Sequence, residues 1–199
     1  LGQGPLLREE GFGMKILDCL TPSSVRVLPE NSRERALGQL ALRRLWHMIY
    51  DPCTRLLAAS PPDGLLILES FLEHASTLHL SMNWALHGHM LSWLRGHHPD
   101  LLNADLAEEL SAASAARWAY SDQTANLGCL LHVPDLMPET AVAAWKSESP
   151  DQAHRVVLIG LKRQPLLAEG IYYCLLAQRR YPADVPWTPL TLQAAPQAF

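Results

Sequence analysis

Apolar side chains recur at helical spacing through the first half of the chain. Between Asn31 and Asp51 they return at every third or fourth residue and form one stripe, while arginine, glutamine and histidine occupy the other faces. Asn31 followed by Glu34 resembles a capping box, which favours a helix start. Pro52 disfavours helical geometry for the residue before it, so the pattern predicts a helix that ends at Asp51.

Prolines and small polar residues mark the starts of further helices. The segment 60–63 carries two prolines and an aspartate, which suit the first turn of a second helix. A third helix is predicted over 81–96, and the apolar residues on most of its sides indicate a central position. A fourth helix begins at Pro99 or Asn103 and continues to about Trp118.

The second half of the chain carries helix-start signals but no alternating runs of valine, isoleucine and threonine. A helix is predicted over roughly 122–132, further helices start at Pro138, Pro150 and Pro165, and the last helix ends before Pro182. The sequence therefore predicts an all-α fold, a single globular domain of about seven or eight orthogonally packed helices.

Glycine and proline are frequent on both sides of this helical region. Residues 1–30 contain several of each and show little periodicity, so we expect an irregular N-terminal arm. Residues 31–182 are expected to form the helical domain, and residues 183–199 a Pro-rich C-terminal tail.

Composition and charge narrow the function classes. Of the 199 residues, 48% are hydrophobic and 18% are charged, which argues against intrinsic disorder. A net charge of −4 gives no reason to expect nucleic acid. The charge is segregated, because residues 21–60 are basic whereas residues 61–110 are acidic. This pattern suits protein partners or self-association, although an ordinary solvated surface would also show it. No uninterrupted apolar run approaches the roughly 20 residues that span a bilayer, so we expect no membrane insertion.

Histidine and cysteine are the residues most able to carry chemistry. Six histidines fall between residues 74 and 98, but none is three or four residues from another, so no two share a helix face as metal ligands would. The four cysteines are isolated and form no C-x-x-C motif. Cys53 lies near His47 and Asp51, which could form a nucleophile and base, but a structural cysteine is the simpler interpretation. We predict no catalytic residues, no metal and no cofactor.

Four short motifs, in this order along the chain, resemble segments of a known family. They are "LWHMIYDP" (45–52), "NWALHGHMLSWLRG" (83–96), "LMPET" (136–140) and "LLAQRRYPADVP" (175–186). They are similar to segments of the OrgA/MxiK/SctK proteins, which are cytosolic accessory subunits of bacterial type III secretion systems. Two features depart from that pattern. Arg55 stands where an aromatic residue is expected, and the segment between Asp51 and Asn83 is shorter.

The resemblance implies a non-enzymatic adaptor of the secretion sorting platform, a virulence apparatus. Such an adaptor would be cytoplasmic and peripheral to the inner membrane. Its partners would be the cytoplasmic domain of the inner-membrane ring protein and the pod protein of the SctQ/SpaO/YscQ type. Two other hypotheses remain, a different helical interaction protein such as a chaperone or regulator, and a metal- or thiol-dependent enzyme.

An adaptor needs two separate contact patches, in which charge supplies steering and aromatic side chains act as anchors. Arginines and aromatic residues near the two ends of the predicted domain are the candidates for these patches. The candidate partner-binding residues are Arg33, Arg35, Arg43, Arg44, Arg179, Arg180, Tyr181 and Trp187.

Overall fold

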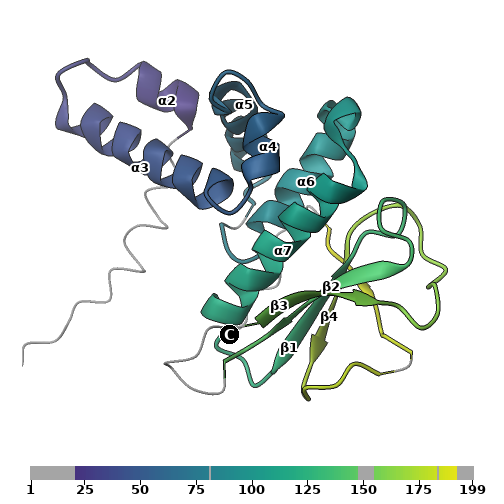
Figure 1. The fold of residues 1–199 in the computed structure, drawn as a ribbon. Coiled ribbons are helices and arrows are strands. Elements are labelled where there is room, and N and C mark those ends of the chain that lie inside the picture. The colour runs from purple at the N-terminus through teal and green to yellow at the C-terminus, as the bar shows by residue number, and fades with distance from the viewer. Residues whose placement is uncertain (1–20, 81, 148–154, 183, 192–199) are drawn as a thin grey trace, which may run out of the picture.

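The chain folds into a helical N-terminal half followed by an antiparallel sheet (Figure 1). This computed structural model describes residues 21–80, 82–147, 155–182 and 184–191. The fold is mixed α and β, so the expectation of an all-α domain is wrong.

The helices come first along the chain. They are α2 (Pro22–Arg26), α3 (Arg33–Tyr50), α4 (Thr54–Ala58), α5 (Leu65–Thr77), α6 (Leu86–His97), the 3-10 helix η1 (Pro99–Leu101) and α7 (Ala104–Ser121). The strands follow as β1 (Gly128–His132), β2 (Thr140–Trp145), β3 (Arg155–Gly160), β4 (Tyr172–Leu176) and β5 (Thr188–Pro189). Their order in the sheet is β3-β2-β1-β4-β5, and neighbouring strands are antiparallel.

Side-chain caps fix the starts of the two longest helices. The Ser32 hydroxyl accepts a hydrogen bond from the Arg35 backbone N–H, at 3.1 Å, so α3 begins one residue later than the capping box predicted. The helix ends before Asp51, as Pro52 indicated. The Asn103 side chain accepts from the Leu106 N–H at 2.9 Å and begins α7, which confirms one of the two predicted starts.

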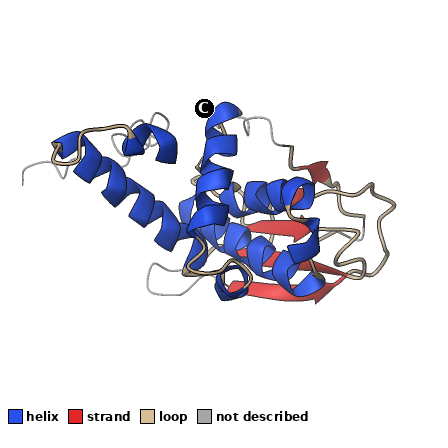
Figure 2. Ribbon diagram, turned by 90° about the horizontal axis from the view of Figure 1, so that it is seen from above, coloured by secondary structure: helices blue, strands red, loops and turns tan. Residues whose placement is uncertain are grey.

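Helix α6 is central, as its apolar sequence predicted. Its buried residues are Leu86, His87, Gly88, His89, Met90, Leu91, Trp93 and Leu94. It packs against α7, and α7 packs against β1 and β2. Seen from above, part of the helical layer overlies the sheet (Figure 2). The main apolar core therefore lies between the helical layer and one face of the sheet.

The second face of the sheet is buried as well. Leu130, Ala143, Cys174 and Leu176 point to this face and form a separate apolar cluster. The segment that follows β4 covers the cluster with Tyr181, Val185 and Trp187. Alternate residues of β1 and β2, such as Leu131 and Val142, belong instead to the main core. Both faces of the central strands are thus apolar.

This double burial explains why strands β1 and β2 were missed. Strands such as "GCLLH" and "TAVAAW" are apolar on both faces, so they lack the alternation of apolar and polar residues that identifies a half-buried strand. They also consist mostly of Ala, Cys and Leu, and only Thr140 and Val142 are β-branched residues that favour strands. The predicted helix over 122–132 is a turn followed by β1. The predicted last helix before Pro182 is absent, because residues 175 and 176 form the end of β4 and residues 177–182 form a loop. Pro138 and Pro165 lie in turns and loops, whereas Pro150 falls outside the described residues.

The expected arm and tail contain regular structure close to the body. Residues 22–26 form α2, which contacts α3 and α5, and residues 188–189 form β5, which pairs with β4. Residues 1–20 and 192–199 lie outside the described residues.

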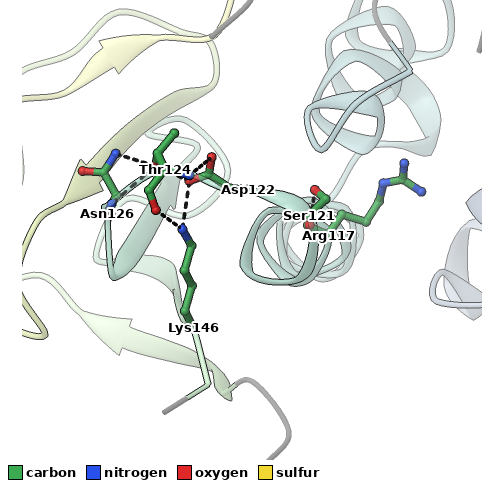
Figure 3. A network of polar contacts seen from close by, with 6 residues as sticks. All are labelled: Arg117, Ser121, Asp122, Thr124, Asn126 and Lys146. Atoms are coloured by element: carbon green, nitrogen blue, oxygen red, sulfur yellow. Dashed lines mark hydrogen bonds and ion pairs between the residues drawn. The ribbon is translucent and has the colours of Figure 1, made fainter. Parts of the chain in front are cut away.

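A polar network joins the end of α7 to the end of β2 (Figure 3). The Lys146 ammonium donates to the Thr124 carbonyl at 2.7 Å and lies 3.3 Å from the Asp122 carboxylate. Asp122 in turn accepts from the Thr124 hydroxyl at 2.6 Å. The Lys146 ammonium is also 5.1 Å from the centre of the Trp118 ring. The network therefore fixes the turn that carries the chain from the helical layer into the sheet.

We expect Lys146→Met to lower the free energy of unfolding by about 2 kcal/mol, because Asp122 loses its cation in a largely buried place. Urea denaturation followed by circular dichroism measures this change. Arg163→Met is the matched control, since Arg163 and Asp184 form a 3.8 Å pair on the exposed surface. Equal stability of wild type and Lys146→Met would contradict the role of the network.

A second tertiary contact starts the short helix α4. The Glu109 carboxylate, on α7, accepts from the backbone N–H groups of Arg55 and Leu56 at 2.9 and 3.0 Å. The residue before the helix, Cys53, makes no side-chain cap of its own. The cap of α4 is therefore supplied from a helix more than fifty residues away.

We expect Glu109→Ala to destabilise the protein by about 1–2 kcal/mol, because the first N–H groups of α4 lose their acceptor. Thermal and urea unfolding both report this loss. The neighbouring Glu108→Ala serves as control and should leave stability close to wild type. If the two variants behave alike, Glu109 does not act as a helix cap.

Candidate partner-binding groove

An open groove of about 520 Å³ lies between α3 and α5. Its floor is apolar and consists of Leu42, Trp46, Leu65, Leu68 and Leu72. Its rim is polar and consists of Gln39, Arg43, His47, Asp63 and Glu69. An apolar floor with a few polar side chains at the edge is the usual composition of a binding site.

Two hydrogen bonds close one end of the groove. The Trp46 indole N–H donates to the Asp63 carbonyl at 2.8 Å, and the Tyr50 hydroxyl donates to the Gly64 carbonyl at 2.7 Å. Gly64 has a φ of 75°, and a Cβ there would lie 2.5 Å from the Tyr50 ring. A glycine is therefore required where α5 begins.

Helix α2 bridges the other end. It contacts both α3 and α5 (Figure 1). Arg26 of α2 forms an ion pair with Glu69 of α5, and Val25 packs against Gly38 of α3 so closely that a Cβ at that glycine would lie 2.7 Å from it. The two walls are thus held apart at a fixed spacing, and the groove exists before anything binds to it.

Some charged residues at the rim of the groove are paired with an opposite charge, and others are not. Glu69 is paired with Arg26, and the ring of His47 lies 3.1 Å from Asp51. Arg43 is exposed, and within the described part of the chain no hydrogen bond or ion pair holds its guanidinium. The α3 side of the groove therefore carries an uncompensated positive charge.

The first predicted arginine patch is divided by the structure. Arg43 lines the groove, whereas Arg33 and Arg44 are exposed elsewhere on α3. Arg35 is half-buried and donates to the Leu28 carbonyl at 3.0 Å, which ties α3 to the loop after α2.

The second predicted patch lies on the far side of the sheet. Arg179 donates to the Lys146 carbonyl at 2.8 Å, and Arg180 is exposed. Tyr181 and Trp187 are half-buried against the second apolar cluster. They also line a smaller hollow of about 230 Å³ beside the loop between β3 and β4. The structure therefore places these four residues in a different layer from the groove.

The sequence indicated the apolar residues of the groove as core. Leu42 and Trp46 belong to the stripe of α3, and nothing in their spacing distinguishes a groove floor from a buried face. The structure leaves Leu65 and Leu66 exposed at the start of α5, and of these two only Leu65 lines the groove.

Residues 25–191 match the family model of the MbnC-like proteins, described as methanobactin biosynthesis cassette proteins. The chain belongs to the MbnC-like family. No curated protein matches the chain. The match extends over both the helices and the sheet, and therefore over nearly the whole described structure.

The family match overturns the resemblance to the OrgA/MxiK/SctK proteins. The prediction of a secretion-platform adaptor is therefore wrong for this chain, together with its ring-protein and pod-protein partners and its virulence role. The family match does not support a chaperone or regulator either. The motifs were short and local. "LMPET" lies in the turn between β1 and β2, and "LLAQRRYPADVP" begins inside β4 instead of a final helix.

The cysteines that the structure describes are buried. Cys53 and Cys129 are fully enclosed, and burial raises the pKa of both thiols well above the usual range. Burial also raises the pKa of the Cys174 thiol. Because the thiolate is the nucleophilic form, burial disfavours Cys53 as the nucleophile that its position near His47 suggested. Cys19 lies outside the described residues.

Within the described ranges, no three or more His, Cys, Asp or Glu side chains are grouped as a metal ion would require. No described helix combines the length and the apolar character needed to cross a bilayer.

Helix α6 places two histidines inside the apolar core. His87 and His89 of α6 are at most 1% exposed, and burial lowers the pKa of each to about 4. For His87, the nearby Arg117 guanidinium lowers the pKa further. Both imidazoles are therefore neutral at physiological pH.

These histidines make stability dependent on pH. Because the folded pKa lies below the unfolded value of about 6.5, their contribution is complete above pH 6.5 and is lost as the pH falls toward 4. We expect the free energy of unfolding to decrease by about 3 kcal/mol per histidine over that range. Urea denaturation at a series of pH values measures the slope. His89→Leu should make the slope shallower, and a flat profile for the wild type would contradict the assignment.

Proposed function

We propose that this protein takes part in methanobactin biosynthesis as a binding component and not as a catalyst. In this role it holds a partner polypeptide of the cassette in the groove between α3 and α5. The family supports the pathway, since its members are described as methanobactin biosynthesis cassette proteins. The groove is the observation that supports the binding role.

The composition of the groove suits a protein surface. Leucine and tryptophan form its floor, and the charged residues stand at its edge, as in the centre and rim of an interface. Trp46 is already held by its hydrogen bond to Asp63 and by the Tyr50 ring, 5.3 Å away between centroids. A rigid aromatic anchor loses little conformational entropy when a partner binds.

The acidic side chains and the histidine at the rim of the groove are engaged in structural contacts. The Asp63 carboxylate accepts from the Leu65 N–H at 3.1 Å, and Glu69 is paired with Arg26. His47 is bound to Asp51 at the end of α3. These arrangements hold the walls of the groove and favour recognition over proton transfer.

A single charge on the floor tests the proposal. In a host whose cassette lacks this gene, we expect wild-type protein to restore methanobactin production and Leu42→Glu to reduce the yield about tenfold or more. The reason is that the new carboxylate must be desolvated when a partner covers the groove. Product yield in the culture and circular dichroism of the purified variant are the two measurements.

Leu40→Glu is the matched control, because Leu40 lies on α3 like Leu42, is 64% exposed and is outside the groove. This variant should restore production as wild type does. Full production with a folded Leu42→Glu would remove the groove from the proposal. Conversion of an accumulated intermediate by the purified protein alone would remove the non-catalytic role.

A further inference from the structure

We infer that the occupant of the groove is an amphipathic helix of a partner protein, with a carboxylate on the flank that faces Arg43. The inference rests on the proposed function, because it names the kind of partner segment that the groove takes. Three observations carry it, namely the backbone of the walls, the length of the groove and the charges at its rim.

The walls exclude an extended strand as the occupant. Both are α-helices, and their interior backbone groups are bonded within each helix. A strand laid between them would find no backbone partners for its own N–H and C=O groups. A helix satisfies its backbone internally and presents side chains alone, so it fits a groove with an apolar floor.

The length of the floor agrees with a short helical segment. The lining residues extend from Gln39 to His47 on α3 and from Leu65 to Leu72 on α5, about two turns of each helix. An amphipathic helix with apolar residues at positions i, i+3 and i+7 covers about 10 Å, a similar distance. The occupant therefore needs about three apolar anchors in two turns.

The rim gives the occupant its charge. Arg43 faces the groove without a hydrogen bond or ion pair from the described residues, while Arg26 already compensates Glu69 on the opposite wall. Docking would partly desolvate the Arg43 guanidinium, and a carboxylate pairs with it in two parallel hydrogen bonds. An acidic residue beside the apolar stripe is thus favoured, and a basic one is disfavoured by repulsion.

The other exposed arginines of α3 carry the same positive charge as Arg43. Arg33 and Arg44 are exposed on the same helix, and neither has an ion pair within the part of the chain that the structure describes. These charges would speed the approach of an acidic segment without contacting it in the groove. The pairing at Arg43 and the attraction by Arg44 can therefore be separated by mutation.

Two designed peptides provide the probe. Each is an amphipathic helix of about sixteen residues with three leucines in the spacing given above. One carries glutamate on the flank of the stripe, and the other carries lysine there. Fluorescence anisotropy of the labelled peptides measures binding to the folded, full-length protein.

We expect the glutamate peptide to bind the wild type and to lose about tenfold or more in affinity with Arg43→Glu. The lysine peptide should show the reverse preference and bind Arg43→Glu better than the wild type. Arg44→Glu is the matched control, since it makes the same charge reversal at the neighbouring residue, which lies outside the groove. Its effect should stay within about threefold and disappear at high salt.

The outcomes separate this inference from the proposed function. Suppose that Leu42→Glu abolishes binding, that Arg43→Glu binds as wild type does, and that the lysine peptide binds as the glutamate peptide does. The groove is then the binding site, and the pairing of Arg43 with a carboxylate is overturned. If neither peptide binds, or if both bind Leu42→Glu as well as wild type, the helical occupant is overturned. A concentration-dependent dimer that the glutamate peptide does not dissociate would identify a second copy as the occupant and also overturn it.

Discussion

The packing of α7 between α6 and the sheet is the contact on which the other elements depend. Its buried surface consists largely of small residues, which allow neighbouring elements to approach closely; they are Ala107, Ser111, Ala113, Ser114, Ala115 and Ala119. The same helix distributes polar contacts around itself. Ser114 donates to the Trp84 carbonyl at 2.7 Å before α6, Glu109 caps α4, and Trp118 lies beneath Lys146 at the end of β2. One helix thus orients both layers.

The groove follows from how α3 is attached to this core. The C-terminal part of α3 is buried through Leu45, Ile49 and Tyr50, whereas its N-terminal part extends away from the sheet and is held by α2 (Figure 1). A helix fixed at its two ends leaves its middle turns facing α5 without filling the space between them. The resulting surface has a defined shape before a partner arrives, and such preorganisation reduces the entropic cost of binding.

The local similarity of the four short motifs to another family has a structural reason. Short motifs such as an apolar helix followed by Asp-Pro describe how a helix stops, and helix stops are common to unrelated folds. Asp51-Pro52 ends α3 here, and Arg55, the residue that departed from the resemblance, lies in α4, where its backbone N–H is capped by Glu109. The MbnC-like match differs because it covers residues 25–191 and therefore both layers together. The family follows from a match over most of the chain, whereas the similarity of four short motifs indicated the wrong family.

The sequence by itself determined the local features that depend on neighbouring residues. It predicted the body of α3, its stop at Pro52 and the central position of α6, and Asn103 was one of its two alternatives for the start of α7, because caps, prolines and apolar stripes act within a few residues. Tertiary structure decided the sheet, since strands buried on both faces lose the alternation that would identify them. It also decided the site. Arg43 and Arg44 are adjacent and chemically identical, and the position of α5 alone makes one of them a groove residue and the other an ordinary surface charge.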